Sequence, residues 1–176
     1  MKKVLKFILY IIILLIIIIA SLEIFSSYKP AIGINQNAPV KTTQSIRINA
    51  PVATVYNIFT DVDNWPSWQK EISAAKINGQ LQVGATIDWK TGGLTIHSTL
   101  KTVVPDSVVG WSGKAFGAFA NHVWQFEQHE GYTIVTVNES MEGWLVSLLK
   151  GYFQSHLELA TKNWLEYLKA QSEKQH

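Results

Sequence analysis

The chain of 176 residues contains no cysteine and only one arginine, Arg47. Without cysteine it can form no disulfide, carry no lipid on a thiol and bind no metal through thiolates. No two histidines stand at metal-ligand spacing on one predicted helix, so we expect no metal site. A domain without thiols is also indifferent to an oxidising compartment.

Excess basic charge is confined to the amino terminus. The first 25 residues hold three of the 15 Lys and Arg residues and one of the 13 Asp and Glu residues, which leaves twelve of each in the remainder. Nucleic-acid-binding domains show basic patches that are usually rich in arginine. Because the rest of the chain is neutral and has a single arginine, we do not expect a nucleic-acid partner.

Motifs for cofactor or nucleophile chemistry are also missing. The segment "GWSGK" (110–114) does not have the spacing of a nucleophile elbow, and no strand-to-helix turn surrounds it. The same glycine and lysine do not form a phosphate-binding loop. We expect no cofactor.

One long apolar run is present at the amino terminus. Residues 7–22 contain no charged or strongly polar side chain, and after Glu23 the run resumes for two residues. The 19 residues that begin at Phe7 and end at Phe25 come close to the roughly 20 that span a hydrocarbon core. A cleaved signal peptide would have an apolar core of only about 7–15 residues. We therefore expect an uncleaved membrane anchor.

Three lysines, Lys2, Lys3 and Lys6, precede this run. Because positive charge marks the cytoplasmic side of a membrane helix, we expect a single-pass protein of the cell membrane. Its amino terminus would be cytoplasmic and its domain extracytoplasmic. The pattern divides the chain into an anchor (1–25), a linker rich in proline, glycine and small polar residues (26–42), a folded domain (43–172) and a disordered tail (173–176).

The folded part predicts one strand, two short helices, a run of strands and a long helix. Ile46 and Ile48 alternate on one face of the first strand, 44–49. Pro51 and Pro66 each open a short helix, since a missing N–H costs nothing in the first turn. Further strands are predicted near 70–78, 85–90, 94–104, 107–113, 117–129 and 132–141. Their hairpin-length links indicate an antiparallel meander.

The last segment predicts an amphipathic helix of about 28 residues, or roughly 42 Å. Apolar residues recur at spacings of three or four from Val146 to Leu168, and Glu158 and Lys162 occupy the other side. Such a helix can cross the whole concave face of a twisted sheet of six or seven strands. The predicted class is α+β, with a separate transmembrane helix.

A set of residues distributed over 44–172 suggests a family. They are Pro51 with Val55, Tyr56 and Phe59; Asp61; Trp65, Pro66 and Trp68; Gly84; Pro105 with Trp111; "HVWQFE"; and "TIVTVNESMEG". In this order the chain resembles the START-like, helix-grip or SRPBCC superfamily, and within it the polyketide cyclase/dehydrase and lipid-transport group. The resemblance implies an incomplete sheet that grips the long helix around an elongated apolar cavity. It does not imply an activity, because the superfamily contains carriers, cyclases and hydratases.

Strand parity predicts which side chains face that cavity. His122 shares a face with Trp124 and Phe126, and Glu139 shares a face with Val137 on the following strand. His122 and Glu139 would then form a polar pair inside the domain, although one bulge would invert either assignment. As an acid–base pair they are the candidate catalytic residues, and as polar groups in an apolar pocket they would orient a ligand. The alternative is a structural pair that satisfies itself in the core.

Aromatic residues complete the predicted ligand-binding set. These residues are Trp68, Trp89, Trp111, Trp124, Tyr152 and His156, in addition to His122 and Glu139. Large aromatics also simply fill cores, so each indole has a structural alternative. Gly151 lies inside the long helix, where it would either pack closely against a strand or allow a bend that opens the entrance.

Three functions remain open at this stage. The first is a membrane-anchored domain that binds a small hydrophobic or amphipathic ligand, such as a lipid or lipophilic metabolite. The second is a cofactor-free enzyme of the cyclase, dehydratase or hydrolase kind that uses His122 and Glu139. The third is a ligand-free scaffold for protein contacts. We expect a small hydrophobic ligand and the membrane as partners.

Overall fold

The structure is a computed structural model that describes residues 2–26 and 32–174. The middle of the predicted linker and the end of the predicted tail lie outside these residues. Among them, seven strands form one antiparallel sheet in the order β1-β7-β6-β5-β4-β3-β2. The strands are β1 (Val40–Ile48), β2 (Ile72–Asn78), β3 (Thr86–Thr91), β4 (Leu94–Val104), β5 (Val108–Ala115), β6 (Ala118–His129) and β7 (Tyr132–Glu142). The predicted meander is confirmed.

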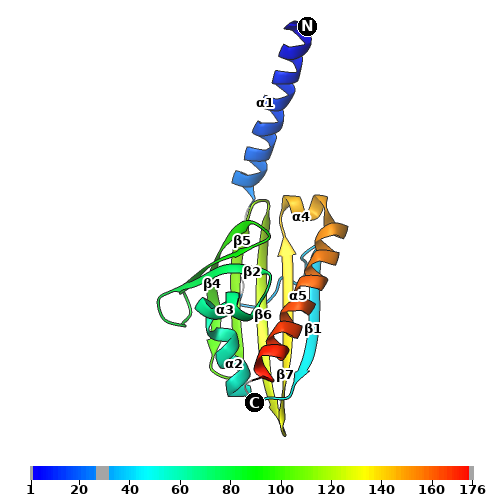
Figure 1. Cartoon of the computed structure of the whole chain (residues 1–176). Helices are drawn as coiled ribbons and strands as arrows, with labels where there is room; N and C mark the ends of the chain where they lie inside the picture. The colour runs from blue at the N-terminus through cyan, green and yellow to red at the C-terminus, as the bar shows by residue number, and fades with distance from the viewer. Residues whose placement is uncertain (1, 27–31, 175–176) are drawn as a thin grey trace.

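The helices cover one face of this sheet and one of its ends. They are α1 (Lys2–Phe25), α2 (Val52–Thr60), η1 (Val62–Asn64), α3 (Trp65–Trp68), α4 (Trp144–Leu148) and α5 (Lys150–Ser172). The long helix α5 runs diagonally across the concave face, and α2 and α3 lie beside its carboxyl-terminal half (Figure 1). This is the predicted helix-grip arrangement.

Most boundaries lie within two residues of the predicted ones, but two features differ more. Strand β1 begins at Val40, four residues before the predicted start, because Lys41 and Thr42 continue the pairing with β7. The residues before it also contact the sheet, since Asn35 N donates to Ser140 Oγ at 3.0 Å. The single predicted carboxyl-terminal helix is two helices, with a break at Leu149, whose φ of −115° and ψ of 37° are not helical.

Gly151 lies just after this break, in the first turn of α5. A side chain built at Gly151 would meet nothing within 4 Å, so the predicted close packing against a strand is absent. The bend therefore belongs to Leu149, and Gly151 is exposed next to it.

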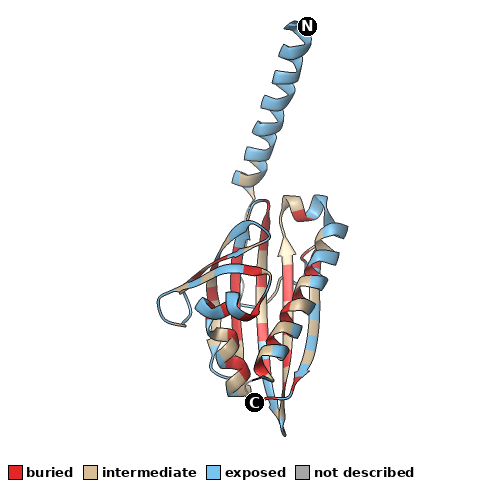
Figure 2. Ribbon diagram, in the orientation of Figure 1, coloured by how far each residue is buried: buried red, intermediate tan, exposed pale blue. Residues whose placement is uncertain are grey.

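The core is divided into a large aromatic cluster and a small aliphatic one. Phe59 lies at the centre of the aromatic cluster, with its ring centroid 4.6 Å from that of Trp124 and 6.1 Å from that of Trp164. The small cluster, Val40, Ala118, Val146 and Leu157, lies toward α4. Buried residues follow the strands on the face toward α5, whereas the described part of α1 buries no side chain (Figure 2).

Candidate functional site

A cavity of about 690 Å³ lies between the sheet and the amino-terminal half of α5. Strands β3 to β7 supply one wall, and α5 supplies the other. The lining comprises Glu71, Trp89, Thr91, Gly92, Leu94, Ile96, Gly113, Ala115, Ala118, Phe119, Ala120, His122, Glu139, Met141, Tyr152, Phe153, His156, Leu157, Leu159 and Ala160. Its volume falls within the 300–1,000 Å³ of typical small-molecule pockets.

The cavity exists because the inward-facing residues of β5 and β6 become smaller along the strands. Going from the aromatic core toward the β5–β6 turn, the pairs across the two strands are Val109 and Trp124, Trp111 and His122, Gly113 and Ala120, and Ala115 and Ala118. The indole rings fill the sheet face in the first two pairs. The last two pairs offer no side chain larger than a methyl group, so α5 passes over an unfilled space.

His122 and Glu139 lie at the boundary between the filled and the unfilled half. They face each other across β6 and β7, with His122 Nδ1 2.9 Å from Glu139 Oε2. Their side chains are only 11% and 9% exposed. The Trp111 ring stacks on the imidazole with the centroids 4.9 Å apart and an interplanar angle of 18°. A polar pair on an aromatic base thus forms the floor of the cavity.

Two further polar groups are fixed in the wall. Glu71, in the turn after α3, accepts a hydrogen bond from Asn163 Nδ2 of α5 at 2.7 Å. The Trp89 indole donates to Ser98 Oγ at 3.0 Å, which holds the ring against the sheet. The lining contains two carboxylates and neither lysine nor arginine among the described residues. An anionic ligand group would find no lysine or arginine among the described residues of this wall.

The structure places five of the eight predicted ligand-binding residues in the cavity wall and three outside it. Trp89, His122, Glu139, Tyr152 and His156 line the cavity. Trp68, Trp111 and Trp124 do not, because the close-packed aromatic cluster around Phe59 and Trp164 holds their rings. Trp111 still supports the site indirectly, because its ring stacks on the His122 imidazole.

The lining residues Tyr152, His156 and Leu159 of α5 are exposed, as are Gly92 and Leu94 of the β3–β4 turn. The opening of the cavity therefore lies between this turn and α5. Tyr152 is 62% exposed, and its ring centroid lies 5.3 Å from that of His156. Both predicted residues on α5 are thus at the entrance, above the floor.

Sequence reasoning missed the residues that create the space. The sequence predicts Gly113, Ala118 and Ala120 only as members of strands and Ala115 as part of the link between them, and it gives no indication that these residues or Glu71 line a cavity. The available signal was the inward parity of these four small residues, which alternate with outward positions on two paired strands. Small side chains on the core face of a strand predict either close packing or a void, and sequence alone does not separate these outcomes.

Comparisons with known proteins agree with this fold. A family model described as polyketide cyclase/dehydrase and lipid transport matches residues 39–171, about three quarters of the chain. The chain belongs to this family. The predicted resemblance is therefore confirmed at the level of the family. A comparison with curated proteins gives no match.

Solved structures show the same fold at low sequence identity. A hypothetical protein from Helicobacter pylori matches at 18% identity with a TM-score of 0.69, over 84% of this chain and 96% of that one. A START superfamily protein from Mycobacterium smegmatis matches at 14% identity with a TM-score of 0.54, over 73% of this chain and 98% of that one.

The di-domain ARO/CYC protein StfQ of the steffimycin biosynthetic pathway matches at 14% identity with a TM-score of 0.67. The match covers 77% of this chain and 52% of StfQ, so the chain spans about half the length of that protein. Likeness at this level of identity shows the fold and not the reaction.

Helix α1 has 24 residues and is long and apolar enough to cross a membrane. Its most apolar stretch is not buried within the structure. A signal sequence near an amino terminus has the same properties. Length and composition thus make α1 a candidate transmembrane helix, but they do not determine its topology.

Proposed function

We propose that the protein is a membrane-anchored binding domain for a small, mostly apolar molecule with one neutral polar group. The observation that carries the proposal is the 690 Å³ cavity, whose wall is mainly apolar and whose floor presents His122 and Glu139. Pockets for small molecules typically combine an apolar wall with a few fixed polar groups that orient the ligand. Here α1 would hold the domain at the outer face of the cell membrane.

The polar floor restricts the chemistry of the ligand. Glu139 is in contact with His122 Nδ1, so Nε2 is the ring nitrogen that remains for a ligand group. A carbonyl or hydroxyl group could pair with this nitrogen, while the apolar part of the ligand would fill the space beside Ala118 and Ala120. A carboxylate would come close to the carboxyl groups of Glu71 and Glu139, with no lysine or arginine among the described residues of the wall. A neutral lipid or lipophilic metabolite fits these conditions.

The experiment is native mass spectrometry of the full chain released from detergent micelles. We expect a co-purifying small molecule, and we expect the variant Ala120→Phe to lose it, because the new ring would occupy the space opposite Gly113. The matched control is Ala74→Phe, the same change at an exposed position of β2. Bare protein in all three preparations would contradict ligand binding and favour a scaffold.

A second candidate function is catalysis by the same pair. It is favoured by the contact of His122 with Glu139 inside a cavity, and by the fold shared with the ARO/CYC protein StfQ. A histidine held by a carboxylate can move a proton to or from a group next to a carbonyl. A turnover found by metabolite screening should then disappear in His122→Ala and in Glu139→Gln. Unchanged rates in both variants would remove the pair from any mechanism.

A further inference from the structure

Glu23 is the one charged residue between Phe7 and Phe25, and the folded domain holds it. Its Oε2 accepts hydrogen bonds from Gly117 N at 3.1 Å and from Trp144 Nε1 at 3.0 Å. Its Oε1 lies 3.1 Å from Lys114 Nζ. Both carboxylate oxygens therefore have partners on the β5–β6 hairpin and α4. We call this group of contacts the Glu23 clasp.

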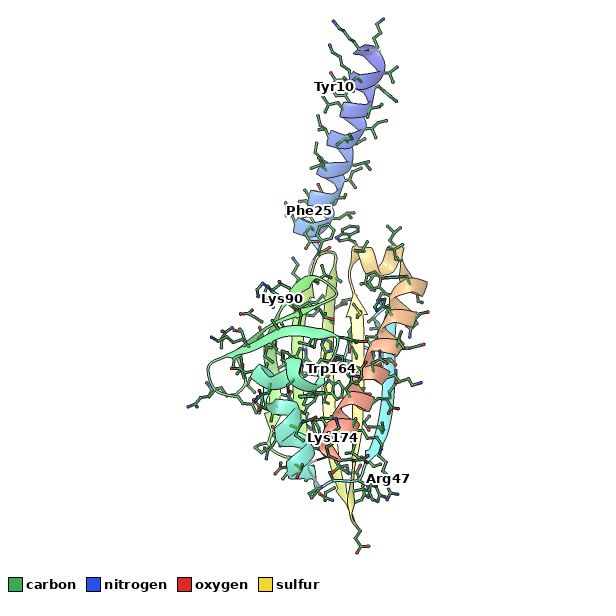
Figure 3. The ribbon with its side chains drawn as sticks, in the orientation of Figure 1. Tyr10, Phe25, Arg47, Lys90, Trp164 and Lys174 are labelled. Carbon is green, nitrogen blue, oxygen red and sulfur yellow. The ribbon has the colours of Figure 1, made fainter. Side chains whose placement is uncertain are left out.

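The clasp sets the depth of the domain relative to α1. Glu23 precedes the last residue of the helix, Phe25, by two positions, or about 3 Å of rise. The groups that contact Glu23 must then lie at the level where the apolar run ends. Figure 3 shows Phe25 directly above the end of the domain that carries the β5–β6 turn and α4. The β6–β7 turn lies at the opposite end (Figure 1).

The end of the domain that meets α1 exposes several large apolar side chains. Phe116 is 58% exposed and Leu148 is 72% exposed, and Leu149 and Tyr152 are also exposed. The Phe116 ring meets the Trp144 ring edge-on, with the centroids 5.5 Å apart. We call Phe116, Trp144, Leu148, Leu149 and Tyr152 the apolar rim. Aromatic residues of this kind are enriched where a membrane protein meets the lipid headgroups.

Two of the elements that carry the rim, the β5–β6 hairpin and α4, are joined through their backbones. Gly117 O accepts a hydrogen bond from Leu145 N at 3.1 Å. A side chain on Gly143 would begin 2.3 Å from Gly117 O, so only glycine allows the hairpin to lie this close to α4. Gly117 thus contributes its N–H to the clasp and its carbonyl to α4, which couples the anchor to both elements.

We propose that the apolar rim lies in the interfacial layer of the same bilayer that α1 spans, and that the Glu23 clasp holds it there. The occupant of this surface is the lipid of that bilayer. The inference rests on the membrane anchoring in the proposed function and is independent of what the cavity binds. Its consequence is that the cavity is next to lipid, since Tyr152 belongs both to the rim and to the cavity lining.

The absence of cysteine permits a direct test by site-specific labelling. Phe116→Cys and Leu148→Cys would each carry a nitrobenzoxadiazole label in the full chain, reconstituted into phosphatidylcholine vesicles. The control is Glu130→Cys in the exposed β6–β7 turn. Interfacial side chains reach about 5–10 Å into the headgroup and acyl boundary. Lipids that are spin-labelled high on the acyl chain should therefore quench the labels at 116 and 148 several-fold more than the label at 130.

The clasp is tested in the same vesicles with Glu23→Ala. Loss of all three contacts should let the domain move on its linker and should lower the quenching at 116 and 148 toward that at 130. The matched control is Ser21→Ala, because the Ser21 hydroxyl donates a hydrogen bond to Ile17 O within α1 itself. Unchanged quenching in Glu23→Ala would overturn the role of the clasp.

The outcomes separate this inference from the proposed function. A chain that alkaline washing strips from the vesicles would overturn the anchor and the rim together. A chain that is retained with unquenched labels would overturn the rim alone. Unquenched labels, together with cross-links between copies of the unlabelled Leu148→Cys variant, would make the rim a protein interface and would also overturn the lipid assignment. None of these readouts depends on a ligand in the cavity.

Discussion

At the scale of single residues, the site depends on a change of side-chain size within two strands. His122 stands where the inward series passes from indole rings to methyl groups, and Glu139 faces it from β7. Strand parity predicts that both side chains face the interior, and the structure agrees. Parity did not separate Trp124 and Trp111, which pack in the core, from Trp89, which lines the cavity. That distinction depends on where α2 and α5 cross the sheet, which no strand pattern contains.

The contact between His122 and Glu139 predicts energetic coupling. Each single change, His122→Ala or Glu139→Ala, leaves a nearly buried polar group without its partner and should cost about 1–3 kcal/mol of unfolding free energy. The double variant should cost less than the sum of the two, with a coupling energy of about 1 kcal/mol. Urea denaturation of the four proteins measures this cycle. Strict additivity would show that the contact contributes nothing to stability.

At the scale of secondary-structure elements, α5 has two halves with different tasks. Its carboxyl-terminal half packs Trp164, Leu165 and Leu168 into the core, and its amino-terminal half covers the cavity with Phe153 and Leu157. The helical periodicity predicted the continuous apolar stripe but not the break at Leu149. Leu149 fits the stripe, so a hydrophobic pattern cannot report that its backbone leaves the helical region.

A hydrogen bond from the Lys169 ammonium group joins the carboxyl-terminal end of α5 to β1. Lys169 Nζ donates to Arg47 O at 2.7 Å and to Glu173 Oε1 at 2.6 Å, and Asn49 N donates to the same carboxylate oxygen at 2.8 Å. The hydrogen bond from Lys169, followed by that from the Asn49 backbone, holds the pKa of Glu173 below its ordinary value of 4.5. Because the folded state favours the carboxylate, this stabilisation is present above that value and is lost as the pH falls below it.

Glu173→Gln should therefore lower the unfolding free energy by about 0.5 kcal/mol near neutral pH, as expected for a pair close to the surface. The difference from the parent protein should vanish under acidic conditions in which both states bind the proton. Urea denaturation at the two pH values checks this. Glu166→Gln, at an exposed position of α5, is the control and should have little effect at either pH. A loss that is equally large in acid would contradict the electrostatic origin.

At the scale of the whole molecule, the fold could be predicted and the position of the anchor could not. The order of strands, turns and helices predicted a helix-grip domain, since each element has a clear periodicity. The contact of Glu23 with Gly117 and Trp144 joins residues 94 and 121 positions apart, and nothing in the local pattern of either partner indicates it. Glu23 interrupts an apolar run in the sequence, but only the structure identifies the residues that it contacts.

The charge of the cavity as a whole predicts a preference among ligands. Because two carboxylates and no lysine or arginine line it, a neutral ketone such as 2-dodecanone should be retained in native mass spectra at lower concentrations than dodecanoate, by about tenfold or more. The two probes share a chain length, so the difference reports the polar end. Equal or tighter retention of dodecanoate would show that the carboxylates do not govern selection.

We infer that a ligand enters the space between β5, β6 and α5 with its polar end at His122. Nuclear magnetic resonance of the full chain in micelles, with labelled alanine methyl groups, tests this directly. With 2-dodecanone as the probe, binding in this space predicts nuclear Overhauser effects from the alkyl chain to the Ala118 and Ala120 methyls, and a shifted His122 ring signal. Effects confined to residues of the apolar rim, with the Ala118, Ala120 and His122 signals unmoved, would contradict it.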